Sequence, residues 1–304
     1  MRDGAIDFSG IWLPLVTPFE ADAAAVDHPA LARLVRRLAA QGVAGFVACG
    51  STGEAAMLDE AEQQAVLATV LGAAGGKPVL MGLAGVRPER VAQRAQALAA
   101  ASAPAGWLLT APAYVKPSQA GIVDFFHRVV EATPLPVVAY DIPARTGVRI
   151  QPATLLALAE HPRIVAVKDC SADRAAAEAI VADGRLALLA GNDDELFDQL
   201  ARGAAGAITA SAHLATAQFV ALAAALRGAG RLEQARALWR RLAPVTRAAF
   251  AEPNPAPIKA ALALGGELHP TLRAPMQSAA PATGQALHAA ALAAALPDAP
   301  ISPR

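Results

Sequence analysis

Lysine is scarce in this chain of 304 residues. Only four of its 26 basic residues are lysines, and the other 22 are arginines, which carry almost all of the positive charge. The four lysines are Lys77, Lys116, Lys168 and Lys259. A lysine at a buried position is therefore a candidate for a role that an arginine could not fill.

Several other absences exclude classes of partner. Aromatic residues make up 4% of the chain, the formal net charge is zero and no block of basic residues occurs, which argues against nucleic acid as a partner. The longest alanine and leucine stretch, Ala289–Leu296, is too short to span a bilayer. Residues 1–9 lack the pattern of a signal peptide. We expect a cytoplasmic protein with no membrane partner.

Metal and cofactor motifs are also missing. The two cysteines, Cys49 and Cys170, do not have the spacing of metal ligands and are expected to be reduced thiols. The six histidines form no His-x-x-x-His pair with an acid. The turn Gly50–Gly53 lacks the Gly-Lys-Ser/Thr ending of a nucleotide P-loop. The sequence therefore predicts no metal and no cofactor.

Apolar runs and helical patterns alternate along most of the chain. Apolar residues make up 55% of the composition, enough for a large core. Eight runs predict strands buried on both faces: Ile11–Val16, Ala44–Cys49, Pro78–Leu83, Gly106–Leu109, Pro136–Tyr140, Ile164–Val167, Leu186–Ala190 and Gly206–Thr209. Eight intervening segments predict helices: Pro29–Ala40, Asp59–Gly72, Arg87–Ala101, Ser118–Ala132, Gln151–Glu160, Ala172–Ala182, Asp193–Ala201 and Ala215–Arg227. This alternation favours an α/β fold, a (β/α)8 TIM barrel of parallel strands.

The pattern changes after Arg227. The remaining helical segments, Arg231–Phe250, Pro257–Leu264 and Thr283–Leu296, have no strand between them. We therefore expect a barrel domain over residues 1–228 and a small C-terminal helical domain over residues 229–304.

The run Ile164–Asp169 places Lys168 at the end of the expected sixth strand. Burial disfavours a charged amine, so its pKa is expected to fall and the free amine could form a Schiff base with a carbonyl substrate. In a barrel of this kind, chemistry occurs at the carboxyl ends of the strands and in the loops that follow them. The alternative is that Lys168 extends to solvent or pairs with Asp169.

Other unusual residues follow neighbouring expected strands. Tyr140 ends the fifth strand and Tyr114 follows the fourth, and these are the only two tyrosines. The turn Gly50–Gly53 follows the second strand and could cap a helix or hold an anion on its backbone N–H groups and hydroxyls. Tyr140 could equally be a core aromatic. Arg145 could be a surface residue or a clamp for a carboxylate.

Seven segments carry a resemblance to a known family. They are Leu15–Phe19, Gly50–Glu54, Ala111–Tyr114 with Lys116–Gln119, Tyr140–Gly147, Val167–Asp169, Leu189–Asp193 and Glu252–Lys259. Over essentially its whole length the chain resembles the dihydrodipicolinate synthase and N-acetylneuraminate lyase family, pyruvate-dependent class I aldolases.

The resemblance implies roles for individual residues. Lys168 would form an imine with the ketone of pyruvate, and Tyr140 would relay protons together with Ser51. Tyr114 would complete the relay in the active site of a neighbouring subunit, which implies a homotetramer built as a dimer of dimers.

Further residues would bind the substrates. The backbone at Ser51 and Thr52 would hold the pyruvate carboxylate, and Ile208 would line the substrate pocket. Arg145 would bind the carboxylate of the second substrate, an aldehyde. The Arg-Thr-Gly sequence at 145–147 resembles the synthases that condense pyruvate with L-aspartate 4-semialdehyde.

Two other functions stay open. Ser51 matches the form common in lyases, so an aldolase, lyase or dehydratase acting on a sugar-derived 2-keto acid, such as a 2-keto-3-deoxy acid or sialic acid, is the first alternative. A non-catalytic pyruvate sensor is the second.

Departures from the family affect regulation. Ala113 replaces an aromatic residue that packs across the tight dimer interface. Lysine-inhibited members have a regulatory pocket at that interface, whose positions correspond here to Val86, Arg90, Ala113 and Glu60. An arginine at position 90 would repel the ammonium group of lysine, so no feedback inhibition by lysine is expected.

Overall fold

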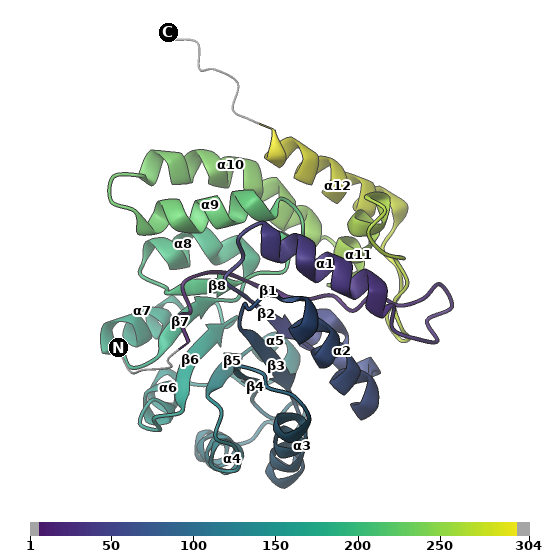
Figure 1. The fold of residues 1–304 in the computed structure, drawn as a ribbon. Coiled ribbons are helices and arrows are strands. Elements are labelled where there is room, and N and C mark those ends of the chain that lie inside the picture. The colour runs from purple at the N-terminus through teal and green to yellow at the C-terminus, as the bar shows by residue number, and fades with distance from the viewer. Residues whose placement is uncertain (1–5, 297–304) are drawn as a thin grey trace.

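Eight parallel strands close into a barrel in the centre of the molecule (Figure 1). The structure, a computed structural model, describes residues 6–296. The strands are β1 (Gly10–Pro14), β2 (Gly45–Ala48), β3 (Val79–Leu83), β4 (Gly106–Thr110), β5 (Val137–Asp141), β6 (Ile164–Asp169), β7 (Ala187–Ala190) and β8 (Gly206–Ile208). Each strand pairs with its neighbours in chain order, and β8 pairs with β1. The expected (β/α)8 barrel is confirmed.

Helices surround the barrel and continue beyond it. The α-helices are α1 (His28–Ala40), α2 (Glu60–Ala73), α3 (Pro88–Ala101), α4 (Gln119–Glu131), α5 (Pro143–Thr146), α6 (Pro152–Leu158), α7 (Arg174–Asp183), α8 (Leu196–Ala201), α9 (Thr216–Arg227), α10 (Leu232–Ala249), α11 (Ala256–Leu264) and α12 (Pro281–Ala295). Four 3-10 turns lie after strands: η1 (Ser51–Gly53), η2 (Ala55–Met57), η3 (Asp193–Glu195) and η4 (Ser211–His213).

One helix prediction needs correction, and one helix is additional. The helix expected from Ala172 begins only at Arg174, because Ala172 has a positive φ of 57° and the side chain of Asp173 caps the first turn by accepting from Ala176 N. The short helix α5 was not expected. Its first residue is Pro143 and its last is Thr146, and the following Gly147 has a φ of 76°, which suits glycine.

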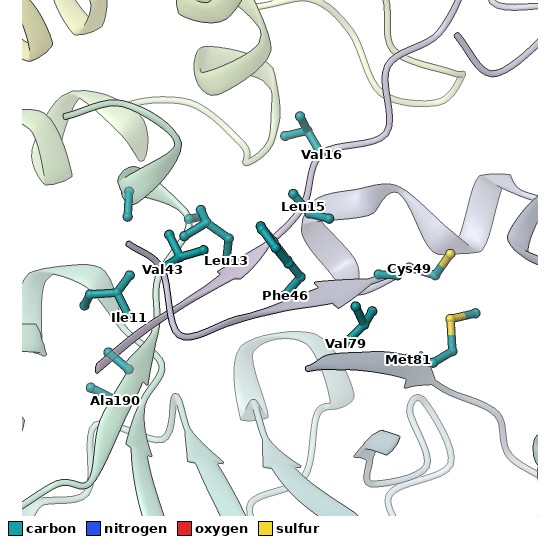
Figure 2. Packing of buried hydrophobic residues seen from close by; sticks show 14 of the residues in the cluster. Ile11, Leu13, Leu15, Val16, Val43, Phe46, Cys49, Val79, Met81 and Ala190 are labelled. Carbon is teal, nitrogen blue, oxygen red and sulfur yellow. The ribbon is translucent and has the colours of Figure 1, made fainter. Parts of the chain in front are cut away.

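Side chains alternate between the two faces of each strand, which explains why the strands are apolar throughout. On β1, Trp12 points into the barrel interior, where it packs with Val47 and other buried residues. Ile11 and Leu13 belong to the larger layer between strands and helices, and Figure 2 shows them with Phe46 of β2. Trp12 also explains why residue 45 is a glycine, because a Cβ at this position would lie 2.4 Å from the Trp12 ring.

Helices α9, α10, α11 and α12 pack together beside the barrel (Figure 1). Arg273, in the loop before α12, forms hydrogen bonds and an ion pair with Glu62 of α2, and its guanidinium lies 4.6 Å from the ring centroid of Phe19. The part of the chain after residue 228 is thus bonded to the loops of the barrel. The division into two domains at residue 228 stays a prediction.

None of the helices described within residues 6–296 is both long and apolar enough to cross a membrane.

Candidate active site

Lys168 and Tyr140 lie side by side at the carboxyl-terminal end of the strands, which we call the mouth of the barrel. They are register partners on β6 and β5. The Nζ atom of Lys168 is 4.4 Å from the centroid of the Tyr140 ring, and both residues are about 95% buried, with 5% and 4% of their surface exposed. The amine is therefore withdrawn from solvent beside a phenol.

The electrostatics of this pair correct one expectation. Burial lowers the pKa of Lys168, but Tyr140, Cys170 and Asp193 outweigh burial, and the net direction is upward. Burial raises the pKa of Tyr140, whereas the charge of Lys168 lowers it, and the net direction is again upward. A raised pKa favours the ammonium form of Lys168, which cannot attack a carbonyl. It has to lose a proton before it can attack a carbonyl, so a proton acceptor is needed nearby.

The turn η1, which follows β2, is the segment expected to hold an anion, and we call it the cradle. Gly50, which precedes it, is extended, and Thr52 is buried with 3% of its surface exposed. The hydroxyl of Thr17 donates to the carbonyl of Gly53 at 2.7 Å, and a Cβ at Gly53 would lie 2.9 Å from the carbonyl of Leu15. The backbone N–H groups at the start of this turn can therefore bind a carboxylate.

Asn254 fixes the hydroxyl of Thr52 from the C-terminal part of the chain. Its Nδ2 donates to Thr52 Oγ1 at 2.9 Å. Because the Thr52 hydroxyl accepts this hydrogen bond, its own proton can be donated to an anion in the cradle.

A buried ion pair lies directly after the same turn. Glu54, which follows η1 with a φ of 54°, accepts from Lys259 Nζ at 2.7 Å, and both side chains are essentially inaccessible. Lys259 also donates to the carbonyl of Thr17 and lies 4.3 Å from the centroid of the Phe19 ring. Lys259, another buried lysine among the four, thus has a structural role.

A cavity of about 420 Å³ lies over Lys168. Six of the residues predicted to act at the site line it together: Ser51, Thr52, Tyr140, Arg145, Lys168 and Ile208. A second cavity of about 510 Å³ shares three of these residues and extends along the barrel edge past Ala113 to Arg94. The mouth therefore combines a buried amine, a phenol, an anion cradle and an arginine around one cavity.

The comparisons with known proteins identify the family of this chain. The sequence model of the dihydrodipicolinate synthetase family matches residues 7–294. The chain belongs to this family. A 4-hydroxy-tetrahydrodipicolinate synthase of Sorangium cellulosum (strain So ce56) is 38% identical over 284 residues, which cover 92% of this chain and 94% of that protein.

Solved structures of the dihydrodipicolinate synthetase family have the same fold. The dihydrodipicolinate synthase of Cyanidioschyzon merolae with lysine bound matches with a TM-score of 0.90 and 30% identity, covering 95% of this chain and 99% of that chain. A monomeric dihydrodipicolinate synthase variant matches with a TM-score of 0.90 and 30% identity, covering 94% of this chain and 97% of that chain.

Tyr114 lies apart from the other predicted residues. Its φ is 72°, 93% of its surface is exposed, and it lines neither of the two cavities just described. Its backbone N–H donates to the carbonyl of Thr146 at 3.1 Å, which holds the loop against α5. Within one chain, therefore, this member of the dihydrodipicolinate synthetase family does not bring Tyr114 to Lys168.

The structure adds residues to the site that the sequence reasoning did not assign. Asp193 is buried behind Lys168, where it accepts from the hydroxyl of Thr209 and the backbone N–H of Ser211, both at 2.6 Å. Burial raises its pKa, and those hydrogen bonds act in the opposite direction. Cys170 lines the cavity, and burial raises the pKa of its thiol to about 11. Asp193 could have been found from the sequence, because it is the last residue of Leu189–Asp193, one of the segments that resemble the family.

Among residues 6–296, no group of three or more histidine, cysteine, aspartate or glutamate side chains is placed to hold a metal ion. The expectation that the enzyme needs neither metal nor cofactor stays a prediction.

Proposed function

We propose that this protein is an enzyme that condenses pyruvate with L-aspartate 4-semialdehyde, as a 4-hydroxy-tetrahydrodipicolinate synthase does. The observation that carries the proposal is the buried Lys168 amine beside Tyr140, in a cavity that also contains Arg145. The names of the curated relatives, including that of Sorangium cellulosum, support the same reaction. We further propose that the protein acts in the cytoplasm.

The reaction would start with proton transfer from the Lys168 ammonium. The free amine attacks the ketone carbon of pyruvate, the carbonyl oxygen leaves as water, and a protonated imine remains on Nζ. Tyr140 and Ser51 would take and return the protons of these steps, because both line the cavity beside the amine.

The second half would form the carbon-carbon bond. The protonated imine draws electrons from the methyl group of pyruvate, which loses a proton and becomes the carbon of an enamine. That carbon attacks the aldehyde, whose oxygen takes up a proton. Hydrolysis of the new imine by water releases the product and restores Lys168. The Ser51 and Thr52 backbone would hold the pyruvate carboxylate throughout.

The test of the reaction is turnover with L-aspartate 4-semialdehyde beside a panel of 2-keto-3-deoxy acids and sialic acid. Condensation with the semialdehyde and little cleavage of the panel supports the synthase. Efficient cleavage of a sugar-derived 2-keto acid without condensation would support the lyase alternative, and inactivity with all of them would support a sensor.

Substitution of Arg145 is expected to affect the aldehyde selectively. The Arg145→Ala variant loses a charge-assisted contact to the aldehyde carboxylate, so the KM for semialdehyde should rise about 10- to 100-fold while the KM for pyruvate changes little. Steady-state kinetics with each substrate varied in turn measure this. Arg128→Ala, which removes an exposed ion pair with Asp124, is the control and should behave as wild type. An equal rise in both KM values would contradict the assignment.

Lysine is expected not to bind or inhibit. Arg90 is exposed on α3, and Val86 is 47% exposed. The positive charge of Arg90 disfavours an ammonium ligand. Calorimetric titration with L-lysine should give no binding tighter than millimolar, whereas the protein of Cyanidioschyzon merolae, whose structure has lysine bound, serves as the positive control. A micromolar dissociation constant would overturn this expectation.

We propose that Tyr114 acts across a subunit interface in a homotetramer. Tyr114, Val86 and Val115 are exposed, and each lies within two residues of Ala113 or Gly85, which line the second cavity; such side chains suit burial against a partner. Dilution followed by analytical ultracentrifugation should show that activity falls as the oligomer dissociates. A dilute monomer with full activity would contradict the role of Tyr114, and the monomeric variant in the family makes this a real alternative.

A further inference from the structure

A second arginine lines the cavity over Lys168. Arg247 lies in the last turn of α10, and the same part of the chain brings Thr246 and Phe250 to the cavity. The neighbouring Val245, Thr246 and Ala249 are fully or almost fully buried, so the backbone that carries Arg247 is held firmly against the barrel. The packing of α10 therefore fixes the point at which the exposed Arg247 side chain leaves the helix at the mouth.

Arg247 and Arg145 reach the cavity from different sides. Arg145 lies on α5, after β5, whereas α10 packs against η3 and η4, the turns that follow β7 and β8. An acceptor aldehyde that enters over Lys168 would thus have one guanidinium on each side of it.

The charges of both arginines are available to a ligand. Within residues 6–296, neither guanidinium takes part in an ion pair or a side-chain hydrogen bond. Of the acids that line the cavity, Asp193 is already engaged by the donors of the β8 loop, and Asp194 is exposed and forms no ion pair with either arginine. Two unpaired guanidinium groups favour a substrate that carries a carboxylate.

We propose that Arg247 is a specificity-determining residue that binds the carboxylate of the acceptor aldehyde together with Arg145. A carboxylate has about four lone-pair sites and can accept from two guanidinium groups at once. The pyruvate carboxylate is already accounted for by the turn at Ser51 and Thr52. The inference rests on the proposed condensation and extends it, because it assigns the acceptor's anion to two arginines from separate parts of the chain.

Kinetics of Arg247→Ala test this assignment. The KM for L-aspartate 4-semialdehyde should rise about 10-fold, with kcat and the KM for pyruvate within about twofold of wild type. Arg247→Lys should recover part of the loss, because it keeps the charge but not the fork of donors. Arg240→Ala, an exposed arginine on the same helix that does not line the cavity, is the matched control. An unchanged KM for semialdehyde in Arg247→Ala overturns the proposal.

A binding measurement separates this proposal from the proposed reaction. Pyruvate is first fixed on Lys168 by borohydride, and succinate, an unreactive dicarboxylate, is then titrated by calorimetry. Binding that weakens about 10-fold in Arg247→Ala supports the assignment even if the semialdehyde proves not to be the substrate. Equal binding by both proteins, or no binding of succinate to the trapped wild-type enzyme, overturns it. Failure of the reaction itself would appear separately, as wild-type enzyme that does not turn over semialdehyde.

Discussion

Replacement of Lys168 by alanine is expected to lower kcat for condensation by about 10³-fold or more. The variant lacks the amine that forms the imine, so the electron sink for loss of the methyl proton is missing. Lys168→Arg should be equally inactive, because a guanidinium keeps the positive charge but stays protonated. Single-turnover kinetics with pyruvate and semialdehyde measure the loss.

Two controls keep this result interpretable. Lys77→Ala removes a lysine that does not line the cavity and should retain wild-type kcat. The melting temperatures of the Lys168 variants should show that they are folded. If folded Lys168→Ala kept more than a tenth of wild-type turnover, an imine at this residue would not be part of the mechanism.

Removal of Lys259 alone is expected to have the largest effect on stability. In Lys259→Met the carboxylate of Glu54 remains in a buried site without its cation, and breaking such a pair typically costs about 3–5 kcal/mol. Burial lowers the pKa of Lys259, the charge of Glu54 opposes that shift, and the net direction is downward. Denaturant unfolding should show a large loss of unfolding free energy.

The double variant Glu54→Gln with Lys259→Met distinguishes the loss of the ion pair from the loss of the packing of its two side chains. It leaves no uncompensated charge and should be clearly more stable than Lys259→Met. Arg174→Ala, which removes an exposed pair with Glu178, should leave the unfolding transition essentially unchanged. A single Lys259→Met variant as stable as wild type would contradict this account of the pair.

We expect the buried pair to link stability to substrate binding. Glu54 follows directly after the turn that holds Ser51 and Thr52, and Lys259 bonds both to Glu54 and to the carbonyl of Thr17. Loosening the pair would loosen the cradle for pyruvate as well.

The barrel and the central pair of residues could be predicted from the sequence for simple reasons. Strands buried on both faces produce continuous apolar runs, and the strand ends of a parallel barrel meet at one edge. Lys168 and Tyr140 are each the penultimate residue of consecutive strands, so their contact follows from the topology and the register. Arg145 reaches the cavity because it lies in the segment directly after Tyr140.

Other features could not be predicted because they depend on distant parts of the chain. Arg247 lies on α10, and the amphipathic pattern of this helix shows that one face is buried but not which elements cover it. Its position at the mouth depends on contacts of α10 with η3 and η4. The pKa of Lys168 was expected to fall with burial, but its direction depends on Tyr140, Cys170 and Asp193, which three different segments bring together. The exposure of Tyr114 likewise depends on the conformation of its loop.

The central claim is that Lys168 forms an imine with pyruvate. The most direct measurement is borohydride reduction of the full-length protein in the presence of pyruvate, followed by peptide mass mapping. Our account predicts a reduced pyruvyl adduct on the peptide that contains Lys168 and no adduct on those that contain Lys77, Lys116 or Lys259. Absence of an adduct from Lys168 in the folded protein, or its presence on another lysine, would contradict the account.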